Sequence, residues 1–412
     1  MTIRRILAIL LLGFLISPAS VEFIMQDGFP TYINAKGKTV KKTTGKSAGK
    51  KKTAKAKTKA SAKKKSTPRI SVLYTDTTTG EWIHRGSRNI VIHRDSMGIV
   101  RAMSPFKAPA TAGKPYAQIL NAYADSLKKR GTKVYSLIAP TQGEFYMPEM
   151  ITDNVSQDQV FRQVANYFSP DVTPIFVADN LRKHIDEEIY NRTDHHWAPL
   201  GAYYAAEELA RQLGTEFIPL DQYCEEHVNN YVGSMYNFSG DPAVRNSPEV
   251  FVYFIPPGDY YAEFIDYKVV DNNTQSESPI HEAPIFRRFP DGSGSAYSTF
   301  LGGDRHTVRI VNKNGINNRK LLIVKDSFGN AMAPCLINSF DEVHVIDFRY
   351  FPHNLPDYMD DNGITDLVFV NCPSIGFSKN ASSRFLKMLT HKEYNADEEF
   401  DEEENEEDEA EE

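Results

Sequence analysis

The strongest constraint on the fold is a repeated pattern in which helical segments alternate with short, apolar strands. Residues 116–130 carry their apolar side chains at helical spacing, and the strand-like run 133–138 follows. Similar runs occur at 321–324, 342–348 and 366–370. Buried strands that alternate with helices belong in a parallel sheet. We therefore predict an α/β fold with a doubly wound, mostly parallel sheet.

Charged segments at both ends bound the part of the chain that folds. Residues 36–65 contain 14 Lys and no acidic residue, and residues 397–412 contain 13 acidic residues. Neither segment has enough apolar surface to form a core. We predict a Lys-rich disordered tether over 36–69, a folded domain over 70–392 and an acidic disordered tail over 393–412.

Residues 215–300 differ in composition from the rest of the folded domain. They are rich in Tyr, Phe, Pro, Asn and Gly, with strand-like runs at 250–254 and 264–267. This composition predicts a β-rich insertion in the α/β domain.

Residues 1–25 have the pattern of an export signal. Two arginines precede the apolar run 6–16, and the small residues 17–19 suit a signal peptidase. If residues 21–25 extend the run to roughly 20 residues, the segment is instead an uncleaved anchor. Cleavage is the favoured interpretation. Both interpretations predict an exported protein of the periplasm or cell envelope, and the second adds an N-terminal membrane association.

Composition also limits the partners and cofactors. The Lys-rich segment lacks the aromatic residues that stack on bases, and the export signal argues against a nucleic-acid partner. An envelope polyanion, or no specific partner, is favoured for this segment. Cys224, Cys335 and Cys372 are not in metal-ligand or CxxC spacing, which excludes a disulfide scaffold. We expect Cys335 and Cys372 to be buried thiols, and we predict neither a cofactor nor a metal.

Two distant motifs offer the parts of a hydrolytic triad. Asp194-His195-His196-Trp197 lies directly before the predicted helix 199–213, and Ser327 follows the run 321–324, where a strand turns into a helix. A histidine held by a carboxylate can activate a serine, and a helix start offers N–H groups to an oxyanion. From the residues alone, simpler interpretations stay open: Ser327 as a helix cap, His195 as the active histidine or a metal ligand, and Trp197 as a packing residue.

A wider set of segments carries a resemblance to a known family. Tyr190 to Trp197, Gly201 and Lys325 to Phe328 closely resemble the bacterial DHHW family, which is similar to the alginate O-acetylation proteins of the SGNH-hydrolase-like group. Further segments that resemble this family are 139–149, with Gln142 where a Lys is common, 233–236, 300–304 and 346–350. The resemblance spans roughly residues 70–390.

The resemblance implies roles for individual residues. In the alginate relatives the Asp-x-His element precedes the serine, and the same order here marks Asp194 as the orienting residue, His196 as the general base and Ser327 as the nucleophile. The Ser327 backbone N–H is the favoured oxyanion donor. Weaker candidates for oxyanion or substrate contacts are Asn330, Arg349, Asn371, Trp197 and Tyr190. For Asn330 and Arg349, helix packing and pairing with Asp347 are at least as favoured.

Two functional hypotheses follow. The first is an extracytoplasmic serine acyl enzyme that acts on a cell-envelope or exported polysaccharide, with O-acetyltransferase ahead of acetylesterase. Transfer implies a membrane-bound O-acyltransferase as the acyl donor. The second hypothesis is a non-catalytic polysaccharide-binding protein that uses Trp197 and the aromatic residues of 215–300 as sugar platforms.

Overall fold

The structure is a computed structural model that describes residues 22–26, 29–33, 70–270 and 273–390. The chain divides into two units, Met1–Pro68 and Arg69–Glu412. In the first unit, strands β1 (Glu22–Gln26) and β2 (Phe29–Ile33) pair antiparallel. The predicted tether and acidic tail, and most of the predicted export signal, lie outside the described residues. Among the helices of the described part, none is long and apolar enough to cross a membrane.

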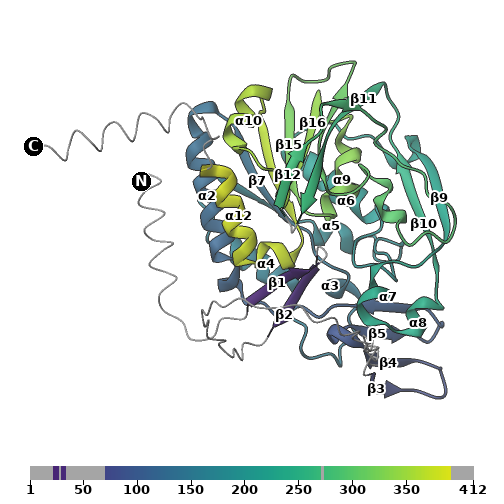
Figure 1. Cartoon of the computed structure of the whole chain (residues 1–412). Coiled ribbons are helices and arrows are strands. Elements are labelled where there is room, and N and C mark those ends of the chain that lie inside the picture. The colour runs from purple at the N-terminus through teal and green to yellow at the C-terminus, as the bar shows by residue number, and fades with distance from the viewer. Residues whose placement is uncertain (1–21, 27–28, 34–69, 271–272, 391–412) are drawn as a thin grey trace, which may run out of the picture. The chain divides into compact units, whose positions relative to one another are not determined.

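A mixed β-sheet forms the centre of the second unit (Figure 1). Its strand order is β12-β11-β14-β16-β15-β17-β7-β8, and β13 pairs with β11. The parallel strands are β16 (Glu342–Asp347), β15 (Lys320–Lys325), β17 (Asp366–Asn371), β7 (Lys133–Ile138) and β8 (Val172–Ile175). The antiparallel extension consists of β14 (His306–Asn312), β11 (Tyr260–Val270), β12 (Asn273–Glu277) and β13 (His281–Glu282). The predicted α/β class is confirmed, with a mixed sheet.

Helices cover both faces of this sheet. Successive side chains of a strand point to opposite faces, and Phe369 of β17 packs against Tyr123 and Phe385, whereas Val368 and Val370 belong to the main core. Helices on or near the Phe369 face are α2 (Lys114–Leu127), α4 (Gln157–Ala165), α10 (Leu355–Asn362) and α12 (Lys379–Thr390). The opposite side carries α5 (Ala178–Arg182), α6 (Pro199–Leu213), α9 (Phe328–Met332) and the 3-10 turn η6 (Ala333–Leu336).

The helix predicted at 199–213 is confirmed as α6. Pro199 fits its first turn because that position needs no backbone donor, and Gly214 ends the helix at a φ of 66°. The first turn of α6 lies against the Ile189 backbone, and the Ala198 N–H donates to the Ile189 carbonyl at 3.0 Å. This contact closes the loop that carries residues 190–197.

An antiparallel accessory sheet precedes the main sheet in the chain. It consists of β3 (Ser71–Thr75), β4 (Trp82–Arg85), β5 (Val91–Arg94) and β6 (Val100–Met103). Its apolar face packs against α7 (Ser234–Ser239) and α8 (Pro242–Arg245), through Ile92 and Ala102 on one side and Met235 and Val244 on the other. The accessory sheet therefore supports the part of the chain that surrounds Asp194.

The segment 215–300 contributes strands in two places. Strands β9 (Cys224–Tyr231) and β10 (Glu249–Ile255) form a separate antiparallel pair, whereas β11 to β13 join the main sheet. Half of its Tyr and Phe rings are buried, as in Tyr231, Phe251 and Phe264, and the other half are partly buried. Short remaining elements are α3 (Gly143–Tyr146), α11 (Pro373–Gly376), η1 (Ser87–Asn89), η2 (Ala110–Gly113), η3 (Lys128–Arg130), η4 (Leu220–Gln222) and η5 (Ala296–Thr299).

The cysteines match the prediction in part. All three are free thiols, and Cys335 is buried as expected. Cys372 was also expected to be buried, but it is partly exposed because it follows the end of β17. Cys224 is exposed.

The contact between α6 and Ile189 gives a stability prediction. A Cβ at Gly201 would lie 2.1 Å from the Ile189 carbonyl oxygen, so Gly201→Ala must push two backbone segments apart. We expect the free energy of unfolding to fall by about 1–3 kcal/mol. The measurement is chemical denaturation beside Arg211→Ala, an exposed change on the same helix that should cost less than about 0.5 kcal/mol. Equal stability of the two variants would contradict the account.

Candidate active site

Ser327 occupies the turn between β15 and α9, at the carboxyl end of the parallel strands. The buried carboxylate of Asp326 fixes this turn, because it accepts the Phe328 N–H at 2.9 Å and the Cys372 N–H at 2.6 Å. Burial raises the pKa of Asp326, and the two N–H donors oppose that rise. The turn is thus tied to the neighbouring strand β17. Ser327 itself stays partly exposed.

The loop of residues 190–197 is closed on itself. Tyr190 and Trp197 form a β-bridge, and the Asn191 side chain donates to the Trp197 carbonyl at 3.0 Å. Glu249 anchors the middle of the loop, because its carboxylate accepts the backbone N–H groups of Arg192 and Thr193, each at 2.7 Å. Such a closed loop holds its own side chains, Asp194 and His196 among them, in one arrangement.

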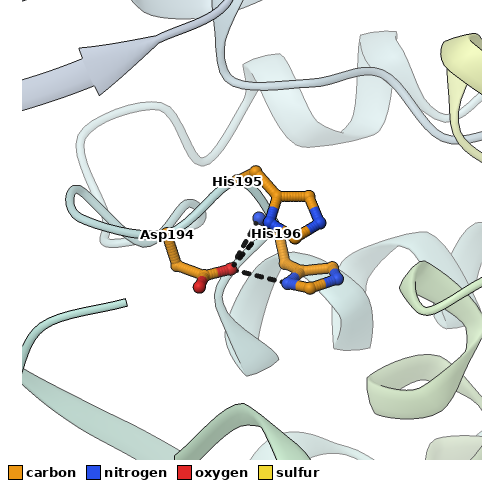
Figure 2. Close-up of side chains that lie close together, drawn as sticks. All are labelled: Asp194, His195 and His196. Carbon is orange, nitrogen blue, oxygen red and sulfur yellow. Dashed lines mark hydrogen bonds and ion pairs between the residues drawn. The ribbon is translucent and has the colours of Figure 1, made fainter. Parts of the chain in front are cut away.

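Three side chains form a continuous line of hydrogen bonds. Asp194 Oδ1 lies 2.6 Å from His196 Nδ1, and His196 Nε2 lies 2.7 Å from Ser327 Oγ. Figure 2 shows the Asp194 carboxylate reaching both histidine rings. The side chains of Asp194 and His196 are 4% and 7% exposed, so water scarcely competes for these bonds. The structure brings together the three residues predicted to form a triad.

Asp194 is held in its charged form. Burial alone would raise its pKa, but the His196 and His195 rings and the hydrogen bond from the Ser234 N–H, at 2.7 Å, hold the pKa of this carboxyl well below its usual range. Gly233 permits the approach, since a Cβ there would lie 2.4 Å from Asp194 Oδ2. The charged carboxylate orients the His196 ring, because Nδ1 of that ring faces it at 2.6 Å.

His195 lies beside the line of hydrogen bonds, not in it. Its Nδ1 is 2.6 Å from Ser234 Oγ, and its ring centroid is 3.7 Å from that of His196. Burial, followed by the charge of His196, lowers the pKa of His195 to about 3, so this ring is neutral near pH 7. The alternative in which His195 contacts the serine does not match this geometry, because Ser327 Oγ is bonded to His196.

Aromatic rings hold the base against the serine turn. Tyr297 stacks on His196, with ring centroids 3.7 Å apart and an interplanar angle of 4°, and its hydroxyl donates to the Ser327 carbonyl at 3.0 Å. Neither Tyr297 nor Glu249 was predicted from the sequence, because no motif marks either residue. The sequence could have indicated Ser234, because this residue lies in the segment 233–236, which resembles the family.

Trp197 and Tyr190 do not fit the expected substrate contacts. Both side chains are fully enclosed, at 0% and 1% exposure. The Trp197 indole N–H donates to the Phe328 carbonyl at 3.1 Å, and the Tyr190 hydroxyl donates to the Pro140 carbonyl at 2.7 Å. Neither ring offers a face to a sugar, so both are packing residues that hold the loop in place.

A buried charge cluster next to Ser327 includes two more of the predicted residues. Arg349 forms ion pairs with Asp347 at 2.6 Å and with Asp304 at 2.9 Å, and Asn330 Nδ2 donates to Asp304 at 2.7 Å. Lys325 also pairs with both carboxylates. Burial would raise the pKa of Asp304, but Lys325 and Arg349 hold it far below its usual range. These side-chain bonds of Arg349 and Asn330 thus go to this cluster.

Asn371 differs from these residues. Its side chain is fully buried at the carboxyl end of β17, and neither Nδ2 nor Oδ1 has a hydrogen-bond partner in the described part of the chain. A buried amide without a partner is costly. Asn371 therefore keeps donor and acceptor capacity that the folded chain does not use.

One set of side chains has metal-ligand geometry. The donor atoms of Asp194, His195 and His196 all lie within 4.8 Å of one another. The relevant atoms already bond to one another and to Ser327, so a metal ion would have to displace the bonds that join His196 to Asp194 or to the serine. The arrangement suits proton transfer better than metal binding.

Comparison with protein families and solved structures places this chain among known relatives. The family described as "DHHW protein" matches residues 102–346. A DHHW family protein of Eubacterium siraeum is 34% identical, with a TM-score of 0.65, over 78% of this chain and 99% of that chain. Bacillus cereus PatB1 is 20% identical, with a TM-score of 0.56, over 79% of this chain and 100% of that chain, which shows a shared fold.

Two curated relatives match a shorter part of the chain. Both are described as "Probable alginate O-acetylase AlgJ". The protein of Pseudomonas syringae pv. tomato is 30% identical over 124 residues, which are 28% of this chain and 30% of the relative. The protein of Pseudomonas aeruginosa is 30% identical over 145 residues, which are 32% of this chain and 34% of the relative. The match spans about a third of the length of these relatives.

The lowered pKa of His195 gives a pH prediction. In the unfolded chain this histidine gains a proton near pH 6.5, whereas in the folded protein it does so only near pH 3. Protonation therefore favours the unfolded chain, and stability is lost as the pH falls from about 6.5 toward 3. With His195→Gln, we expect the loss in free energy of unfolding between pH 7 and pH 4 to shrink by about 1–3 kcal/mol. Denaturant titrations at both pH values measure it; an unchanged loss would contradict the assignment.

Proposed function

The chain belongs to the DHHW protein family, and on that premise we propose that it is an exported serine acyl enzyme that transfers an acetyl group to a polysaccharide hydroxyl. The observation that carries the proposal is the line of hydrogen bonds from Asp194 through His196 to Ser327. Both curated relatives are described as probable alginate O-acetylases, which supports the choice of acetyl group and polysaccharide.

The proposed first half-reaction forms an acyl-enzyme. Ser327 Oγ attacks the carbonyl carbon of the acetyl donor while its proton passes to His196 Nε2, and the charged Asp194 stabilises the resulting imidazolium. The bond between the carbonyl carbon and the donor oxygen breaks, and this oxygen leaves with the proton from His196. The acetyl group is then an ester of Ser327.

The proposed second half-reaction returns the serine. A sugar hydroxyl attacks the acetyl carbonyl, and His196 takes the hydroxyl proton. The ester bond to Ser327 breaks, and His196 returns the proton to Ser327 Oγ. With water in place of the sugar, the same steps make the protein an acetylesterase, so only the second half-reaction separates these two activities.

The proposed oxyanion donor is the backbone N–H of Ser327. It has no hydrogen-bond acceptor among the residues that the structure describes, and it lies at the start of α9. Two such donors usually share the charge of a tetrahedral intermediate. Among the weak side-chain candidates, Asn330 and Arg349 already bond to Asp304 and Asp347, and Asn371 is fully enclosed although its amide has no partner in the described part of the chain.

We also propose the finer organisation of the chain. The main domain, residues 70–392 with a β-rich insertion at 215–300, is a doubly wound SGNH-like fold; the helices on both sheet faces support this. Residues 1–25 are a signal peptide or anchor, 36–69 a tether and 393–412 an acidic tail. The protein acts in the periplasm or cell envelope, and a membrane-bound O-acyltransferase supplies the acetyl group.

The alternative of a non-catalytic polysaccharide-binding protein has less support. It relied on Trp197 and the aromatic residues of 215–300 as sugar platforms. Trp197 is fully enclosed, and rings such as Tyr231, Phe251 and Phe264 are at most 1% exposed. The Ser327 side chain, in contrast, is partly exposed.

Ester turnover tests the proposed mechanism. With a chromogenic acetyl ester, Ser327→Ala and His196→Ala should lower kcat/KM by about 10³-fold or more, because they remove the nucleophile and the base, and Asp194→Asn should lower it by about 10²-fold or more, because it removes the charge that orients and stabilises the base. Ser383→Ala, on the surface of α12, is the matched serine control and should leave the rate unchanged. Turnover by Ser327→Ala at the control rate would refute the mechanism.

A second assay separates the three possible activities. Addition of an oligosaccharide acceptor should produce acetylated sugar in the unaltered protein, and free acetate alone would identify an esterase. Glycan binding that survives Ser327→Ala, together with no turnover in any variant, would favour the binding protein.

A further inference from the structure

The turn between β4 and β5 brings an arginine to the edge of the candidate active site. The Arg88 guanidinium carbon lies 5.2 Å from the centroid of the Phe238 ring, and that ring lies 5.5 Å from the ring of His195. The turn rests on α7, since a Cβ at Gly86 would lie 3.4 Å from Ser239 Cβ. Arg88 is therefore within the reach of a short oligosaccharide that is bound at Ser327.

Arg88 occupies a backbone position that suits other residues better. Both Arg88 (φ 55°) and Asn89 (φ 60°) are left-handed, as the two central residues of a tight hairpin turn must be. Asparagine and glycine adopt this conformation most readily, and an arginine there is strained. Backbone strain of this kind is common at ligand-binding positions, where the strained residue is kept because its side chain binds the ligand.

The charge of Arg88 is not used within the fold. Arg88 is exposed and forms no ion pair or hydrogen bond in the part of the chain that the structure describes. The neighbouring Arg85, in contrast, donates to Asn89 and to Asp153. Phe238 supports the guanidinium through its ring face, which leaves the planar N–H fork for a ligand.

We propose that Arg88 binds the carboxylate of an acidic sugar unit in the acceptor, near the unit that receives the acetyl group. This inference rests on the proposed function and names the class of acceptor. A guanidinium fork matches a carboxylate through two parallel hydrogen bonds, and it has no comparable partner on a neutral sugar. Arg88 is thus a specificity-determining residue, separate from the residues that carry the acyl transfer.

Binding measurements on the full chain test this site. The probes are alginate and galacturonate oligosaccharides, each beside its carboxyl-reduced, neutral form, measured by titration calorimetry. The unaltered protein should bind at least one acidic form about 10-fold more tightly than its neutral form. Arg88→Asn should abolish this preference, and Arg88→Lys should keep part of it. The matched control is Lys133→Ala, an exposed cation at the opposite end of the parallel strands, which should retain the preference.

The Tm of Arg88→Asn separates a binding role from a structural role, because loss of an arginine that stabilises the fold would lower the Tm. Because Asn suits the left-handed backbone better than Arg, Arg88→Asn should raise the Tm by about 1–3 °C while it abolishes the acidic preference. Turnover of a small acetyl ester should not change in this variant. An Arg88→Asn protein that still prefers the acidic form, or an unaltered protein that prefers neither form, would overturn the proposal. Absence of ester turnover in the unaltered protein would count against the proposed function alone.

Discussion

The His196 ring is the interaction on which the site depends, because it bonds on one side to Asp194 and on the other to Ser327. The histidine and the serine are 131 positions apart in the chain. Proton transfer between them requires hydrogen-bond distance, and an error of about 1 Å can cost roughly 100-fold in rate. The fold therefore has to hold two loops in one fixed relation.

Two buried carboxylates outside this line provide much of that fixation. Asp326 binds the N–H groups of Phe328 and Cys372, which ties the serine turn to the neighbouring strand. Glu249 binds the backbone of the loop that carries Asp194. Burial raises the pKa of both carboxyls, so each opposes folding electrostatically as it ionises. The chain keeps them because satisfied buried networks specify one geometry.

Local patterns in the sequence predicted the α/β class and the helix at 199–213, and they made the three residues of the hydrogen-bonded line candidates, whose roles the family resemblance then assigned. These features depend on periodicity and on short motifs at strand and helix ends. Tyr297 and Glu249 escaped prediction, because their contacts join segments that are far apart in the sequence and carry no local signature. Trp197 was expected as a weak substrate contact, yet it packs inside the loop, since a motif does not reveal which of its side chains are enclosed.

The most direct test of the account is intact-mass analysis of the protein after brief exposure to an activated acetyl ester, followed by peptide mapping. The account predicts one acetyl adduct located on Ser327, which is absent from Ser327→Ala and forms slowly in His196→Ala. A folded protein that gains no adduct, or that carries it on another residue, would contradict the claim that His196 activates Ser327 as a nucleophile.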